Sequence, residues 1–330
     1  NYFRHMDRTM IQFDFVTQDK PSNFYDGEVR SLGGRLHYVP LLSIDRIFDF
    51  SKAFSRLLLD NPGYKIIHCH LNWLNIVPLA IAKKHNVPVL ISHSHGSYQA
   101  RSILKRLQRL VFQWLIGYYS TDLIACSEAA GIWLYGKKFV KNSKAKTIFN
   151  AIDLDKYGFK PDVRKKLRDV HNISLKSHVL ICSSRFSEGK NHDFLVKIFD
   201  EYQRLNGDSF LILAGEGPTL SVIKKEVQEM GLGDKVLFLG MTSKVHDYLS
   251  VADVFVFPSK SEGLGMALVE AQVSGLHTIA SKEGVPKEAD VSQSTIFLSL
   301  SKTPSEWARQ IYKLRNKKRI DRARAIKEAG

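Results

Sequence analysis

The sequence lacks a long apolar run. Across its 330 residues, no window approaches the roughly 20 consecutive apolar residues that a membrane-spanning helix needs. The first ten residues, NYFRHMDRTM, hold no apolar stretch of the kind found in a secretory signal peptide. We therefore expect a cytoplasmic protein, whose contact with a membrane would be peripheral and at its inner face.

Cysteine is scarce, and the three cysteines are Cys69, Cys126 and Cys182. Their odd number and wide spacing in apolar runs exclude a disulfide framework and indicate buried, reduced thiols. His68 and His70 flank Cys69, and in a strand these two imidazoles would share one face while the thiol points to the other. The sequence shows no second cluster of ligands, so we expect no metal site.

Acidic residues are in deficit, with 33 Asp and Glu against 48 Lys and Arg, for a formal net charge of +15. Such a charge suits nucleic acid, an anionic membrane surface or phosphorylated ligands. No zinc finger, helix-turn-helix or RNA-binding aromatic motif accompanies it, so we expect no nucleic-acid partner. The hydrophobic share of 44% and the length are those of a globular protein with two cores.

Short β-branched runs alternate with amphipathic helical stretches along nearly the whole chain. Most of the runs are continuously apolar, which is typical of parallel strands covered on both faces. The strand candidates are IQFDFVT, RLHYVP, KIIHCH, VPVLIS and DLIACS, followed by HVLICSS, FLILAGEG, KVLFLG, DVFVFPS, HTIASK and TIFLSL. The alternation predicts an α/β protein with doubly wound parallel sheets.

The alternation pauses in a polar stretch rich in Lys and Arg, between Asn150 and His178. We place a domain boundary there and predict two Rossmann-like domains, residues 1–150 and 151–330, that face each other across a cleft. Ligands of such sheets bind beyond the carboxyl ends of the strands. Residues 1–10 look like the end of a helix, so we expect the first domain to lack its opening strand and turn.

Basic residues follow the first strand of the second domain. Arg185 and Lys190 come directly after HVLICSS, and Lys190 opens a helix. A guanidinium, an ammonium and the N–H groups of a helix start suit a diphosphate, although two basic residues in a basic protein could equally be surface decoration. The turn LAGEGP carries Gly215, which permits close backbone approach, and FLGM could place Gly240 and Met241 against a base.

The segment SEGLGMALVEA places Glu262 before a glycine-rich turn and Glu270 within the helix that follows it. The backbone N–H groups of residues 264–267 would form an anion site at the start of this helix. A carboxylate only accepts hydrogen bonds, so Glu270 suits the two hydroxyls of a ribose. The simpler interpretation is an exposed helix residue for Glu270 and a favourable N-terminal charge for Glu262.

The sequence resembles the retaining glycosyltransferases of family four, which have the GT-B fold. EGLGMALVE is similar to their E-x7-E motif, and SRFSEGKNHDFLV, LAGEGP, TIFNAIDLDKY and the segment from VLFLG to TIAS follow the family pattern in order. VPVLISHSHGS resembles the histidine-bearing loop of the first domain. The closest resemblance is to enzymes that build capsular or exopolysaccharide repeat units from nucleotide sugars.

The resemblance implies a role for each matching position. Arg185 and Lys190 would bind the donor diphosphate, Glu270 the ribose, and Glu262 would lie near the transferred sugar. His95, or alternatively His93, would reach the sugar from the first domain. The implied catalytic residues are His95, Glu262, Arg185 and Lys190, and the implied donor-binding residues are Arg185, Lys190, Gly215, Gly240, Met241, Gly263, Leu264, Gly265, Met266 and Glu270. Family members use no metal, so the resemblance implies no cofactor.

The resemblance also implies the reaction. A UDP-sugar would donate its sugar, with retention at the anomeric carbon, to a glycan or a polyprenyl-pyrophosphate-linked acceptor. A phosphorylase or sugar-nucleotide epimerase of the same fold remains the alternative among enzymes. A non-catalytic protein that binds a nucleotide sugar or nucleic acid remains the alternative among binding proteins. The family's glycine-rich loop after the first strand has no counterpart in this sequence.

Residues 101–119, RSILKRLQRLVFQWLIGYY, place four basic residues ahead of aromatic and apolar ones. This pattern predicts a helix at an anionic membrane interface. An ordinary amphipathic helix with a buried aromatic face explains the same pattern equally well.

Overall fold

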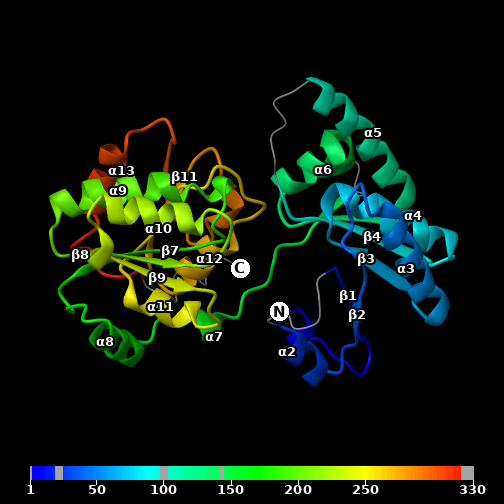
Figure 1. The fold of residues 1–330 in the computed structure, drawn as a ribbon, viewed down its shortest axis with the longest axis horizontal. Helices are drawn as coiled ribbons and strands as arrows, with labels where there is room; N and C mark the ends of the chain where they lie inside the picture. The colour runs from blue at the N-terminus through cyan, green and yellow to red at the C-terminus, as the bar shows by residue number, and fades with distance from the viewer. Residues whose placement is uncertain (1, 19–24, 97–102, 142–144, 321–330) are drawn as a thin grey trace. The chain divides into compact units, whose positions relative to one another are not determined.

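The chain folds into two compact α/β units. The computed structural model describes residues 2–18, 25–96, 103–141 and 145–320. The two units are Asn1–Ala151 and Ile152–Gly330. Each unit has parallel strands with helices between them, as Figure 1 shows, so the predicted pair of Rossmann-like domains is confirmed. Of the helices in the described ranges, none is both long and apolar enough to cross a membrane.

The first unit alternates strands and helices after a short N-terminal helix. Its elements are α1 (Tyr2–His5), β1 (Phe15–Thr17), α2 (Asp26–Ser31), β2 (Leu36–Tyr38), α3 (Ile47–Asp60), β3 (Ile66–Cys69), η1 (Asn72–Asn75), α4 (Ile76–Lys84), β4 (Val89–Ser94), α5 (Ile103–Tyr119), β5 (Asp122–Ala125), α6 (Glu128–Lys141) and β6 (Ala145–Thr147). Strands β1 and β2 pair with each other, and a second sheet has the order β3-β4-β5-β6.

The second unit has one six-stranded parallel sheet with the order β12-β11-β10-β7-β8-β9. Its elements are α7 (Leu154–Tyr157), α8 (Pro161–Val170), β7 (His178–Ser183), η2 (Glu188–Lys190), α9 (His192–Leu205), β8 (Ser209–Ala214), α10 (Leu220–Glu229), η3 (Gly233–Lys235), β9 (Val236–Gly240), α11 (Val245–Val251), β10 (Val254–Phe257), α12 (Met266–Val273), β11 (His277–Ser281), η4 (Lys287–Ala289), β12 (Ile296–Leu298) and α13 (Pro304–Tyr312).

Each strand candidate from the sequence overlaps a strand of the structure. Strand β6 was not among the sequence candidates, because AKT is short and contains no continuous apolar run. From β7, the chain adds β8 and β9 on one side of the sheet and then β10, β11 and β12 on the other, so the strand order changes direction at β7. A doubly wound sheet opens a crevice beyond the carboxyl ends of its strands at such a point. The loops after β7 and β10 therefore have the position of a ligand site.

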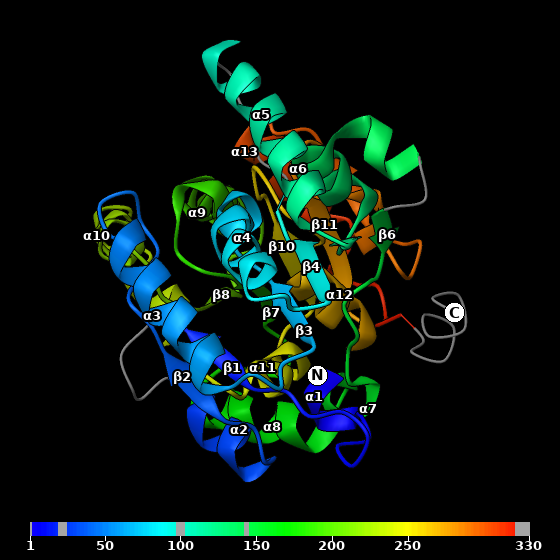
Figure 2. The same cartoon turned by 90° about the vertical axis from the view of Figure 1, so that its right-hand side faces the viewer.

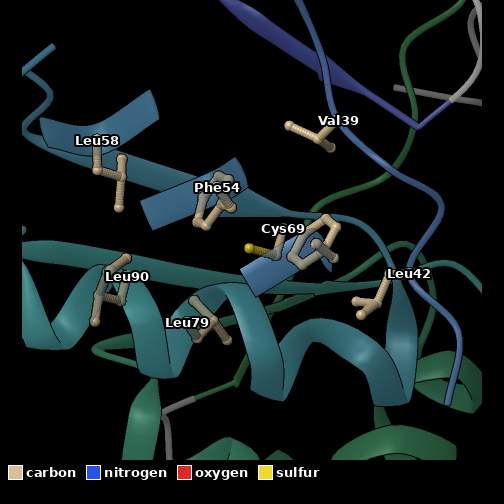
Figure 3. Close-up of a cluster of buried hydrophobic side chains, with 9 residues drawn as sticks. Val39, Leu42, Phe54, Leu58, Cys69, Leu79 and Leu90 are labelled. Carbon is tan, nitrogen blue, oxygen red and sulfur yellow. The ribbon is translucent and has the colours of Figure 1, made fainter. Parts of the chain in front are cut away.

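The core of the first unit lies between α3, α4 and β3. Figure 3 shows Phe54 and Leu58 of α3, Leu79 of α4 and Cys69 of β3 directed toward one another. These four side chains are at most 7% exposed, and burying a Leu or Phe stabilises a fold by about 1.5–3 kcal/mol. Cys69, Cys126 and Cys182 are all buried and free, as the sequence analysis predicted.

Arg168 and Arg319 donate hydrogen bonds to carbonyl oxygens near the C-terminal ends of helices in the second unit. Arg168 is fully buried and donates to the carbonyl oxygen of Val251 and to Asp253, which lies just before β10. The guanidinium of Arg319 donates to the carbonyl oxygens of Leu249 and Ser250, in the last turn of α11, of Ala252, which follows it, and of Ser274, which follows α12. Arg319 thereby satisfies carbonyl groups that helix ends leave unpaired.

Candidate active site

The loops after β7 and β10 are joined by hydrogen bonds. The carbonyl oxygen of Gly189 accepts from the backbone N–H of Lys260 at 2.7 Å and from the hydroxyl of Ser259 at 3.0 Å. Asn191 adopts a left-handed backbone conformation and its amide donates to the carbonyl oxygen of Pro258 at 3.0 Å. Strands β7 and β10 pair in parallel, so these bonds fix the two loops at one edge of the sheet.

Lys190 and Glu262, which are 72 residues apart in the sequence, form an ion pair across these loops. The ammonium of Lys190 donates to a carboxylate oxygen of Glu262 at 2.6 Å. The side chain of Glu262 is only 8% exposed, whereas that of Lys190 is 23% exposed. A buried carboxylate needs such a partner, because an unpaired charge away from water is costly. The ion pair therefore holds both side chains in place.

Arg185 lies beside this pair in the sequence but is left open to solvent. Its side chain is exposed and has no hydrogen-bond or ion-pair partner within the described part of the chain. A guanidinium in this state can turn toward an anion without breaking an internal contact. Two cations therefore follow β7: Lys190, which is paired with Glu262, and Arg185, whose side chain is exposed.

Helix α12 begins at Met266, and Gly265 before it has a φ of 88°. An L side chain rarely adopts this left-handed conformation, so glycine lets the chain turn directly from the loop into the helix. The first turn leaves backbone N–H groups without partners inside the helix, and they suit a negative group. The predicted start of this helix near Gly265 is confirmed.

Glu270 lies one turn inside α12 and is partly buried. Burial raises the pKa of its carboxyl to about 7, although a hydrogen bond from Tyr157 and the charge of Lys156 act in the opposite direction. Tyr157 ends α7, which packs against α12. Tyr157 ends the segment TIFNAIDLDKY, which resembles the family, but the resemblance implied no role for its side chain. The side-chain interaction could not be read from a spacing of 113 residues.

The turn after β8 is packed directly against the loop after β7. Gly215 has a φ of 136°, and a Cβ atom at this position would lie 2.1 Å from the carbonyl oxygen of Ser184. Its backbone N–H donates to the carbonyl oxygen of Gly240 at 2.9 Å. The next residue, Met241, is 60% exposed. The structure therefore brings Gly215, Gly240 and Met241 to the same end of the sheet as Arg185 and Lys190.

The predicted residues of the second unit consequently converge on one sheet edge. Arg185 and Lys190 follow β7, Gly215 follows β8, and Gly240 and Met241 lie at the end of β9. The remaining ones come from the loop after β10 and from α12; they are Glu262, Gly263, Leu264, Gly265, Met266 and Glu270. Cations, helix N–H groups and a hydrogen-bonded carboxyl at one edge can hold a molecule with phosphate and hydroxyl groups.

Four histidines of the first unit, His68, His70, His93 and His95, lie at the ends of β3 and β4. His93 is 6% exposed, and His95, just after β4, is more accessible. The expectation that His68 and His70 have no further ligands near them is wrong, because His93 lies beside both. The parallel pairing of β3 with β4 brings together these histidines, which are about 25 residues apart in the sequence.

Models of two families together cover nearly the whole chain. Residues 1–156 match Glycosyltransferase Family 4, and residues 163–330 match Glycosyl transferases group 1. EpsF of Bacillus subtilis, which is named as a glycosyltransferase, is 34% identical over 314 residues, or 94% of this chain and 82% of EpsF. The chain belongs to the family 4 glycosyltransferases. It is therefore a transferase with the GT-B fold, as the resemblance implied.

A second sequence relative and a solved structure are also similar to this glycosyltransferase. An Escherichia coli UDP-Gal:α-D-GlcNAc-diphosphoundecaprenol α-1,3-galactosyltransferase is 28% identical over 286 residues, which are 82% of this chain and 72% of the relative. The crystal structure of Anabaena HepE with UDP-glucose superposes with a TM-score of 0.73 at 17% identity, covering 96% of this chain and 92% of HepE. The second likeness supports the fold.

Proposed function

We propose that this glycosyltransferase moves a sugar from a UDP-sugar, with retention of anomeric configuration, to a lipid-linked acceptor during capsular or exopolysaccharide assembly. The observation that carries the proposal is the convergence of Lys190, Arg185 and the first turn of α12 at one sheet edge, with Glu270 one turn further on. The name of the Escherichia coli relative supports both a UDP-sugar donor and an undecaprenol-diphosphate acceptor. The UDP-glucose complex of HepE is consistent with this donor.

In the proposed reaction, Arg185, Lys190 and the α12 N–H groups stabilise the charge that develops on the leaving diphosphate. Glu270 accepts hydrogen bonds from the ribose hydroxyls, and Glu262 lies near the transferred sugar. The acceptor hydroxyl attacks the anomeric carbon and loses its proton to a phosphate oxygen of the departing nucleotide. Transfer by this route uses no metal.

A panel of nucleotide sugars tests the donor. We expect UDP and at least one UDP-sugar to raise the melting temperature of the full-length protein, because a ligand at about 100 times its Kd stabilises the folded state by about 2.7 kcal/mol. GDP-sugars and ADP-sugars serve as controls. Stabilisation by a GDP-sugar alone would overturn the choice of base. Analysis of the product anomer by NMR, with a lipid-pyrophosphate acceptor, then tests retention.

The same assay separates the alternatives. A phosphorylase would consume its glycoside only with inorganic phosphate, and an epimerase would convert the nucleotide sugar without an acceptor. A binding protein would show stabilisation without product. Sugar transfer that depends on the acceptor and releases UDP contradicts all three.

We also propose that α5 docks the enzyme on an anionic membrane at the cytoplasmic face. In its described part, Leu110, Val111, Trp114 and Tyr118 are 56–64% exposed, so the aromatic face is not fully buried within its own unit. Exposed aromatic residues next to basic ones are typical of interfacial helices. Arg101 and the side chains of Lys105 and Arg106, which belong to the predicted basic set, lie outside the described residues.

Replacement of Arg101, Lys105, Arg106 and Arg109 by Gln is expected to weaken sedimentation with vesicles that contain anionic lipid. Each basic residue near such a surface contributes about 1 kcal/mol. A matched control replaces Lys165, Lys166, Lys224 and Lys225, which are exposed in the second unit. Equal sedimentation of the α5 variant and the wild type would contradict a docking role.

A further inference from the structure

Four histidine side chains gather at the carboxyl ends of two adjacent strands. β3 and β4 pair in parallel and lie side by side in Figure 2. Nε2 of His68 lies 3.1 Å from Nδ1 of His93, and Nδ1 of His70 lies 2.7 Å from Nε2 of His95. Cys69, which lies between His68 and His70 in the sequence, points into the apolar core (Figure 3). The alternation of side chains along each strand therefore places all four imidazoles on the opposite face.

Three of these histidines are close enough to share one ion. One ring nitrogen from each of His68, His70 and His93 lies within 4.8 Å of the other two. Zn²⁺ binds imidazole nitrogen at about 2.0–2.1 Å, which puts tetrahedral ligand atoms roughly 3.4 Å apart. The separations of the ring nitrogens therefore exceed this spacing by at most about 1.4 Å.

The buried member of this group has an unsatisfied nitrogen. His93 is 6% exposed, and its Nε2 has no hydrogen-bond partner among the residues that the structure describes. A buried polar atom without a partner typically costs about 1–3 kcal/mol, and such atoms call for an explanation such as a bound ion.

The ligand set selects the kind of ion. Neutral imidazoles suit Zn²⁺, Ni²⁺, Co²⁺ and Cu²⁺, whereas Mg²⁺ and Ca²⁺ prefer oxygen ligands. Among the described residues, the cluster of possible ligands here contains imidazoles and no carboxylate. His68 and His70 are exposed, so an ion would keep a coordination position open to solvent.

We propose that His68, His70 and His93 form a binding site for one divalent transition-metal ion, with Zn²⁺ as its biological occupant. The proposal goes beyond the transfer reaction, whose donor-binding groups lie on the second unit and need no metal. An ion in this site would lie beside His95, because His70 contacts both. A hydrogen-bonded stack of neutral histidines is the competing explanation, and metal binding distinguishes the two.

The test measures metal binding directly. Full-length protein without a polyhistidine tag, stripped with EDTA, is titrated with Zn²⁺ by calorimetry and with Co²⁺ by visible absorption. We expect one ion per chain with a Kd on the order of micromolar or tighter, and no binding of Mg²⁺. Absence of stoichiometric Zn²⁺ and Co²⁺ binding would overturn the proposal, whether or not the protein transfers sugar.

Two variants locate the ion. His68→Gln, at an exposed position, is expected to weaken binding by about tenfold or more and to change the Co²⁺ spectrum. His5→Gln, at an exposed position elsewhere in the same unit, is the matched control and should bind as the wild type does. Binding by His68→Gln at wild-type affinity would place the ion elsewhere and reject the site. His93→Gln should show the same loss, and His68→Gln decides the outcome if that buried substitution prevents folding.

Discussion

Lys190→Ala is expected to lower kcat/KM for sugar transfer by about 10²–10³-fold, the effect of removing one preorganised charge stabiliser from a transition state. Lys190 is the cation that the structure holds at the end of β7, 2.6 Å from Glu262. The measurement is the initial rate of UDP release with a saturating acceptor. A variant with wild-type turnover would show that Lys190 has no part in transfer.

Loss of Lys190 also leaves Glu262 without its cation, so the single variant is expected to be less stable. The Lys190→Ala/Glu262→Gln double variant removes both charges and separates the two effects. We expect urea unfolding to show that the double variant is more stable than Lys190→Ala, because an unpaired buried carboxylate is costlier than a neutral amide. Transfer should remain low in both. Recovery of activity along with stability would mean that Lys190 has only a structural role.

Glu270→Ala is expected to cripple transfer, mainly through weaker donor binding. The carboxylate is the proposed partner of two ribose hydroxyls, and hydrogen bonds to a charged group contribute about 1.5–3 kcal/mol each. The expected result is a KM for the donor raised by about tenfold to a hundredfold, together with a lower kcat. Glu229→Ala, on the exposed end of α10, is the matched control. An unchanged donor KM would contradict the ribose assignment.

Glu270 also gives the free protein a pH dependence whose sign can be tested. Burial raises the pKa of this carboxyl to about 7 from its ordinary value of 4.5. Between these two pH values the folded protein holds a proton that the unfolded chain has released, so stability falls as the pH rises through this window. Glu270→Gln removes this dependence. The difference between wild type and variant in urea unfolding, followed from pH 5 to 8, should therefore grow with pH.

The strands and the order of the elements could be predicted from the sequence, because continuous apolar runs are a local signal. The pairings that build the site could not. Lys190 meets Glu262 through a parallel pairing of β7 with β10, and Tyr157 reaches Glu270 through the packing of α7 on α12. His68 and His93 meet for the same reason, through β3 and β4. Side chains within one strand can be assigned to a face from the sequence, but the neighbour of that strand cannot.

The expectation that failed most clearly concerned His68 and His70. An isolated HCH triplet offers too few ligands, and that judgement was correct for a single strand. HSH at the end of the next strand has the same alternation, and the parallel register, in which Cys69 lies opposite Ser92, brings His93 beside His68 and His70. A repeated polar pattern at the ends of two apolar runs was the signal that could have revealed the cluster.

The guanidinium of Arg319 connects the end of the described chain to the helix that carries Glu270. The carbonyl oxygen of Ser274, at the end of α12, accepts a hydrogen bond from Arg319. The same guanidinium donates to the carbonyl oxygens of Leu249 and Ala252, at the end of α11. The backbone N–H of Ile320 adds a bond to the carbonyl oxygen of Gly275. Residues 319 and 320 therefore link the C-terminal ends of α11 and α12. Changes in sequence or chain length near residue 319 should therefore alter donor affinity even though the segment itself touches none of the proposed donor-binding side chains.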